Sequence, residues 1–100
     1  IMTIGEFQET IRNIYFNKDD ERGLDGTFSW FIEEVGELSR AMRNKDLPAM
    51  KEEFADVLAW LVSMASICGV DIESAAMEKY FAGCPKCGSS PCACPADRRG

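Results

Sequence analysis

The sequence predicts an all-α domain followed by a small cysteine-rich tail. Apolar residues recur at helical spacing in four segments, and no segment shows the sustained alternation that is typical of a strand. From residue 83 onward, glycine, proline and cysteine replace the helical pattern. These observations divide the 100-residue chain into a helical domain, residues 1–82, and a tail, residues 83–100.

The composition restricts the partners and the chemistry. The net charge of -6 disfavours binding to nucleic acid polymers or to an anionic membrane surface. The chain has no histidine, so it lacks the commonest general base and the commonest transition-metal ligand. The N-terminal residues do not resemble a secretory signal, and the most apolar run, residues 57–70, is too short to span a membrane. We therefore expect a cytoplasmic protein.

The first two helices are predicted from a capping signal and from apolar periodicity. Thr3 and Glu6 have the spacing of a capping box, and the apolar stripe that follows predicts a helix over residues 3–16. The next residues, 17–26, are polar and contain two glycines, which predicts a loop. Apolar periodicity resumes over residues 27–43 and predicts the second helix.

The third and fourth helices each follow an aspartate that can cap them. Asp46 precedes the third helix, residues 47–68, which Gly69 is expected to stop. Asp71 precedes a short fourth helix, residues 72–81. The order of elements is thus two helices, a short turn near residue 45, and two further helices.

Two pairs of carboxylates lie beside the apolar faces of the second and third helices. On a helical wheel, Glu34 and Glu37 share one flank, and Glu53 and Asp56 share the matching flank. Glu37 and Glu53 are equally far from Lys45 along the chain, and so are Glu34 and Asp56. An antiparallel hairpin that turns at Lys45 therefore brings all four acids to one seam. Converging carboxylates without histidine indicate a hard cation, Mg²⁺ or Mn²⁺, of the kind that assists phosphate chemistry.

The same residues also allow a non-enzymatic interpretation. Glutamate is a good helix former, so the acids could form a solvated face of a helical interaction module with a metal-bound tail. Trp30 and Trp60, which are also equally far from the turn, could pack in the core or stack on a nucleobase.

Two motifs resemble a known enzyme family. "EEVGEL" and "EEFADVLAWL" resemble the EExxE…ExxD signature of the MazG-type all-α nucleoside triphosphate pyrophosphohydrolases, and "GVDIESAAMEKY" is similar to the segment that follows in that family. The resemblance covers Thr3–Tyr80. It implies Mg²⁺-dependent cleavage of (d)NTPs to (d)NMP and pyrophosphate, in a four-helix bundle formed by a homodimer or a dimer of dimers. The residues that it implies are the metal ligands Glu34, Glu37, Glu53 and Asp56, the water-orienting Glu33, and the substrate-binding Trp30, Trp60, Lys79 and Arg22.

The family often has an asparagine and further basic residues in or after the last helix, where this chain offers Lys79. The resemblance does not separate dUTP- or dCTP-type substrates from phosphoribosyl-ATP. Dimerisation is also expected from the residues themselves, because large aromatics lie on more than one predicted helix face of a small chain. These aromatics are Phe7, Phe16, Phe28, Trp30, Phe31, Phe54 and Trp60.

The tail sequence "CPKCGSSPCAC" places four cysteines within eleven residues. Cys84, Cys87, Cys92 and Cys94 predict a tetrahedral, structural Zn²⁺ site. An iron–sulfur cluster, disulfides and a disordered tail are the alternatives, and the ligands could be shared between two subunits. The fifth cysteine, Cys68, is predicted to be a small buried apolar residue.

Overall fold

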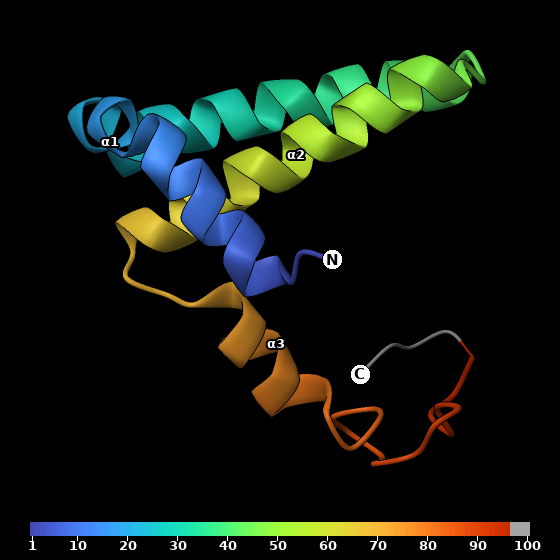
Figure 1. Ribbon diagram of the computed structural model, residues 1–100. Helices are drawn as coiled ribbons and strands as arrows, with labels where there is room; N and C mark the ends of the chain where they lie inside the picture. The colour runs from blue at the N-terminus through green and yellow to red at the C-terminus, as the bar shows by residue number, and fades with distance from the viewer. Residues whose placement is uncertain (97–100) are drawn as a thin grey trace.

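The computed structural model describes residues 1–96 and contains three helices and no strand in that range. Helix α1 spans Ile4–Arg43, α2 spans Leu47–Ile67 and α3 spans Ile72–Tyr80 (Figure 1). The predicted all-α class is confirmed. The last four residues of the predicted tail lie outside the described residues.

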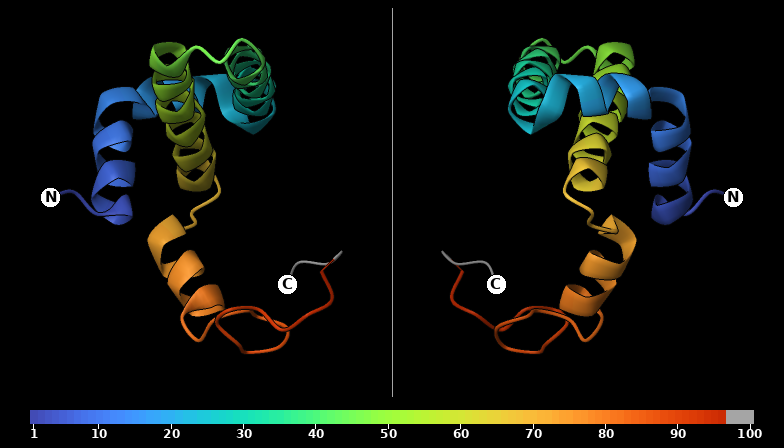
Figure 2. Two further views of the ribbon diagram at one scale, coloured as in Figure 1. Left: turned by 90° about the vertical axis from the view of Figure 1, so that its right-hand side faces the viewer. Right: turned by 90° about the vertical axis from the view of Figure 1, so that its left-hand side faces the viewer.

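Helix α1 is bent at Gly23, and the predicted loop over residues 17–26 is wrong. Every residue of that segment is helical except Gly23, which has φ +82° and ψ 175°. Its lysine, glutamate and arginine are good helix formers, so one glycine interrupts the helix without replacing it by a loop. The bend sends the N-terminal segment of α1, residues 4–22, to one side of α2 and the C-terminal segment, residues 24–43, to the other (Figure 2).

The C-terminal segment of α1 and α2 form an antiparallel hairpin with a very short connection (Figure 1). Lys45 adopts φ +53° in the turn, and the backbone N–H of Asp46 donates to the carbonyl of Ala41 at 3.1 Å. The Asp46 carboxylate then caps α2 by accepting from the Ala49 N–H at 3.2 Å. The predicted turn and cap are confirmed, and they fix the register of the two helices.

A buried glutamine fastens the N-terminal segment of α1 to the connection between α2 and α3. The Gln8 side-chain amide donates to Ser66 Oγ at 3.2 Å and to the Val70 carbonyl at 2.8 Å. Its oxygen accepts from the Ile72 N–H at 3.0 Å. Gln8 is only 8% exposed, so this network replaces the water that its amide would otherwise bind.

The core of a single chain is small. Its buried apolar side chains are Ile11, Leu38, Ala41 and Val62. The apolar periodicity of the two hairpin helices predicts one buried face on each. Most side chains of these faces are solvent-exposed, so the prediction of burial is wrong for one chain. The exposed members are Phe28, Ile32, Val35 and Met42 on α1 and Leu47, Phe54, Leu58 and Leu61 on α2.

Cys68 is also exposed, which contradicts its predicted burial, because it follows the last residue of α2 at the open end of the hairpin.

Within residues 1–96 no single helix is long and apolar enough to cross a membrane. In the described part of the chain, α2 and α3 taken together have the length and composition, but they are bent by 97° at their connection.

Candidate functional site

Three carboxylates from the two hairpin helices meet at the seam. Glu34 comes from α1, and Glu53 and Asp56 come from successive turns of one flank of α2. Each offers an oxygen that lies within 4.8 Å of the oxygens offered by the other two. The register set by the Lys45 turn therefore brings together three of the four acids that the sequence predicts as metal ligands.

The electrostatics of this cluster favour a cation. The Glu53 Oε2 atom is buried and has no hydrogen-bond partner among the described residues. The pKa of Glu34 is raised to about 7, first by burial and then by the neighbouring carboxyl groups of Glu53, Asp56 and Glu37. An unpaired buried oxygen among mutually repelling carboxylates is a donor set that suits a hard divalent ion, so the residues present fit Mg²⁺.

Glu37 and Glu33 occupy different positions from the three clustered acids. Glu37 is exposed and lies outside the cluster, one turn closer to the hairpin end, where it lines a cavity of about 150 Å³ that also contacts Glu53 and Arg40. Its charge is still near enough to raise the pKa of Glu34. Glu33 is exposed on the side of α1 that the helical wheel predicts.

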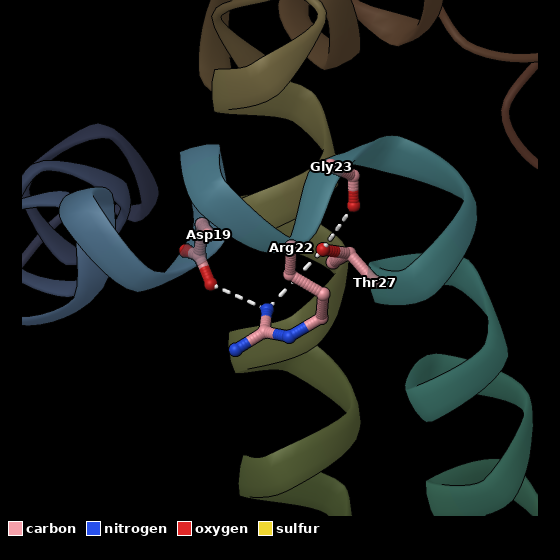
Figure 3. Close-up of polar contacts among 4 residues, drawn as sticks. All are labelled: Asp19, Arg22, Gly23 and Thr27. Carbon is pink, nitrogen blue, oxygen red and sulfur yellow. Dashed lines mark hydrogen bonds and ion pairs between the residues drawn. The ribbon is translucent and has the colours of Figure 1, made fainter.

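Arg22 is held in place by two buried side chains at the bend of α1 (Figure 3). Its Nη1 atom donates to Asp19 Oδ1 at 2.9 Å and to Thr27 Oγ1 at 3.2 Å. The Thr27 hydroxyl donates in turn to the Gly23 carbonyl at 2.7 Å. Asp19 is 4% exposed and Thr27 is fully buried, so the ion pair is largely protected from solvent.

A cavity of about 260 Å³ lies between this arginine and the carboxylate cluster. The Arg22 guanidinium carbon is 4.9 Å from the centre of the Trp60 ring, and Trp30 stacks on Trp60 with ring centres 6.1 Å apart. Asp56 lines the cavity and also belongs to the cluster, so the cavity opens beside the candidate metal site. Its charged and aromatic lining residues are Tyr15, Lys18, Asp19, Arg22, Asp56 and Trp60.

The structure therefore brings Arg22, Trp30 and Trp60 together near the acids, as the sequence predicts for substrate-binding residues. Lys79 lies elsewhere, on α3, with its ammonium nitrogen 5.6 Å from the centre of the Tyr80 ring. It does not line the cavity beside Asp56.

Sequence reasoning missed the residues that orient Arg22. The sequence predicts a loop at Asp19 and a helix start at Thr27, and it indicates no binding role for Tyr15 or Lys18. One signal was available, because Asp19 and Arg22 have the i, i+3 spacing of a helical ion pair. That spacing has meaning only in a helix, so it was hidden by the loop prediction.

A second group of potential metal ligands lies in the tail. The Sγ atoms of Cys84, Cys87, Cys92 and Cys94 all lie within 4.8 Å of one another. Backbone N–H groups, first that of Ala93, lower the pKa of the Cys87 thiol to about 6. This cluster comes from one chain and is separate from the carboxylates of the hairpin.

Residues 22–88 match the sequence profile of the MazG nucleotide pyrophosphohydrolase domain. The chain belongs to this family. The MazG match includes the hairpin, the three clustered carboxylates and Arg22, and it confirms the resemblance carried by the two acidic motifs. No curated protein matches the sequence.

Membership in the MazG family implies nucleotide binding and hydrolysis of nucleotide phosphoanhydrides. The match begins at the bend of α1 and ends at residue 88, so it extends past the predicted domain boundary at residue 82. That boundary stays a prediction.

Proposed function

We propose that this protein is a Mg²⁺-dependent pyrophosphohydrolase that cleaves (d)NTPs to (d)NMP and pyrophosphate, with Mn²⁺ as an alternative metal. The observation that carries the proposal is the cluster of Glu34, Glu53 and Asp56 beside a cavity lined by Arg22 and Trp60. Membership in the MazG family supports the same class of reaction.

In this proposal the clustered carboxylates hold the metal ion. Glu34, Glu53 and Asp56 would supply the oxygen ligands, and Glu37, which shares a cavity with Glu53, would add negative charge beside them. Bound Mg²⁺ supplies positive charge for the phosphate oxygens and lowers the barrier to attack by water. Water adds across the phosphoanhydride between the α- and β-phosphates, that P–O bond breaks, and pyrophosphate leaves.

The remaining residues would orient the water and the substrate. The family resemblance assigns Glu33 to orient the attacking water and accept its proton, but Glu33 is exposed and belongs neither to the cluster nor to the lining of this cavity, so the geometry of one chain does not support that role. Arg22 and Lys18 provide positive charge at the cavity for the phosphates, and their placement next to Asp56 suits a triphosphate bound to the metal. Trp60, with Trp30 stacked on it, provides an aromatic wall for the nucleobase. Lys79 does not line this cavity, so it would not contact a substrate bound there.

We further propose that the enzyme works as a homodimer or as a dimer of dimers. The exposed apolar faces of α1 and α2 lie along the same hairpin that carries the acids. A second copy packed on these faces would complete a four-helix bundle around a two-fold axis. The exposure of Phe28, at 52%, and of Phe54, at 55%, supports this arrangement, since a stable monomer rarely leaves such side chains uncovered together.

The proposed activity is tested by assaying pyrophosphate release from a panel of (d)NTPs with Mg²⁺ and with Mn²⁺. Glu53→Gln removes the charge of the proposed ligand whose Oε2 atom is buried, and we expect kcat/KM to fall by roughly 100-fold or more, since metal catalysis is worth several kcal/mol. Glu52→Gln is the matched control, because Glu52 is the neighbouring residue of the same type and is exposed. Its activity should stay within about two-fold of the wild type.

Equal activity of Glu53→Gln and Glu52→Gln would contradict the proposed site. The absence of pyrophosphate from every (d)NTP with both metals would contradict the proposed substrate class. That second result would instead favour a helical interaction module, in which the acids have no catalytic role.

A further inference from the structure

We propose that the tail binds one Zn²⁺ ion per chain through the four cysteines Cys84, Cys87, Cys92 and Cys94, and that this closed site holds the tail in its fold. The site is separate from the nucleotide chemistry proposed above, because none of its ligands comes from the hairpin. It requires no contribution from a second subunit.

Two of the six distances between the sulfur atoms match a tetrahedral zinc site, and all six are within 4.8 Å. A Zn–S bond of about 2.3 Å gives a tetrahedron whose sulfur atoms are about 3.8 Å apart. The Sγ atoms of Cys84 and Cys94 are 3.8 Å apart, and those of Cys87 and Cys92 are 3.9 Å apart. All four thiols are free, and these separations are nearly twice the bond length of about 2.0 Å in a disulfide.

The backbone is shaped to bring the sulfurs together. The Gly88 N–H donates to the Cys84 carbonyl at 2.7 Å, and the Cys84 N–H donates to the Ser89 carbonyl at 3.0 Å, which closes the loop between the first two cysteines. Gly88 has φ +71°, a conformation that favours glycine. Gly83 has φ +103°, and a Cβ atom there would lie 2.9 Å from the Ser89 oxygen, so the loop closes only because this residue is glycine.

Two backbone N–H groups donate hydrogen bonds to the cysteine sulfur atoms. The Ala93 N–H donates to Cys87 Sγ at 3.2 Å, and the Cys94 N–H donates to Cys92 Sγ at 3.3 Å. Such N–H···S bonds orient metal-bound thiolates and stabilise their negative charge. Four soft ligands with no open position select zinc over Mg²⁺ and exclude a substrate-binding role for the ion.

Apart from its backbone hydrogen bonds, the described part of the tail has little to stabilise its fold. None of residues 83–96 is buried, so the segment has no apolar core of its own. Residues 81–96 also contain no helix or strand, yet the four thiols converge. A segment of this kind folds around a metal ion, because the energy of the metal–sulfur bonds replaces that of a core.

The test measures metal on the full-length protein, purified under reducing conditions with Zn²⁺ in the medium. Native mass spectrometry and elemental analysis should both give one zinc per chain. After exchange, Co²⁺ should give the intense visible bands of a tetrahedral site together with sulfur-to-cobalt charge-transfer absorption, a signature that carboxylates do not produce. These readouts do not depend on hydrolase activity, so they separate this inference from the proposed function.

Paired variants locate the site. Cys87→Ser should lower bound zinc at least ten-fold, whereas Cys68→Ser should retain one zinc per chain, because Cys68 lies outside the cluster. Circular dichroism should show that both variants keep the helical domain. Should Cys87→Ser misfold, the metal content and cobalt spectrum of the unmodified protein still decide the question.

Three results on the wild-type protein would overturn the inference. These are reduced wild-type protein that binds no zinc, iron with inorganic sulfide at the tail, or a mass lower by two hydrogens for each disulfide. Equal zinc loss in Cys87→Ser and Cys68→Ser would also overturn it.

Discussion

Neighbouring acids in this chain have different roles because the helix turns them to different sides. Glu52 is exposed, whereas Glu53 keeps a buried, unpaired oxygen beside Glu34. The same contrast occurs near the bend, where Asp19 is buried against Arg22 and Asp20 is exposed. Each pair differs by about 100° around the helix axis, which is enough to separate a site residue from a solvated one.

The Asp19–Arg22 ion pair gives a prediction about substrate binding. Asp19→Asn keeps the shape of the side chain but removes the charge that holds the guanidinium over Trp60. We expect KM for the preferred (d)NTP to rise by roughly ten-fold, the equivalent of a charged hydrogen bond of about 1.4 kcal/mol, while kcat stays within about two-fold. Steady-state kinetics of pyrophosphate release measures both parameters.

Asp20→Asn is the control, since it makes the same chemical change at the adjacent exposed position. Its KM should equal that of the wild type. If the two variants have the same KM, Asp19 does not position Arg22 for the substrate.

Helix α1 positions the site because it bends once, at Gly23. The N-terminal segment reaches one side of α2 and delivers Arg22 to Trp60, while the C-terminal segment lies on the other side and delivers Glu34. A straight helix of 40 residues could not contact α2 from two sides. The backbone conformation of one glycine thus decides which residues meet.

The bend gives a prediction about stability. Gly23→Ala places a Cβ on a backbone with φ +82°, where it meets no atom within 4 Å, so the cost is backbone strain alone. We expect the free energy of unfolding to fall by about 1–3 kcal/mol. Urea denaturation followed by circular dichroism measures this change as a lower midpoint.

Gly36→Ala provides the opposite control. Gly36 lies within the regular part of α1, and its Cβ would also meet no atom within 4 Å. There alanine should raise the free energy of unfolding by about 0.5–1 kcal/mol, because it favours the helix. A shift of both midpoints in the same direction would show that Gly23 is not a strained position.

The molecule as a whole carries an apolar surface that one chain does not bury. Within residues 1–96 only four apolar side chains are buried, whereas ten large apolar side chains on the hairpin are exposed. A core of that size is small for an independent domain, so association is the most direct way to stabilise the hairpin. The acids lie beside this surface, so association would also enclose the candidate site.

Association is tested by introducing charge on the exposed apolar face. Val35 is 39% exposed on the apolar face, so Val35→Glu should leave the monomer folded but should place one carboxylate of each copy in the proposed interface. We expect the dimer Kd to rise by at least about 100-fold, since buried unpaired charges cost several kcal/mol. Size-exclusion chromatography with light scattering gives the molecular mass of each species.

Ser29→Glu adds the same charge on the same helix, away from the apolar stripe, and should remain a dimer. A wild-type protein that is monomeric at high micromolar concentration would contradict the proposed association outright.

Helical periodicity and short-range signals were sufficient to predict much of this structure. The caps at Thr3, Asp46 and Asp71 all form as their sequences predict, because each depends on residues three positions apart. The meeting of Glu34 with Glu53 and Asp56 was also predictable, because a short turn fixes the heights of residues on both helices. The tail cysteines are so close in sequence that their convergence needs no distant contacts.

The tertiary structure decided the features that depend on distant or unusual backbone geometry. The sequence of residues 17–26 does not reveal that one glycine bends a continuous helix, because glycine can adopt both negative and positive φ and only the structure shows that Gly23 has φ +82°. Burial of Asp19 and Thr27 around Arg22 follows from that packing. Periodicity identified the apolar faces correctly. Which of these faces one chain buries depends on how its helices pack in three dimensions, and no local sequence pattern contains that information.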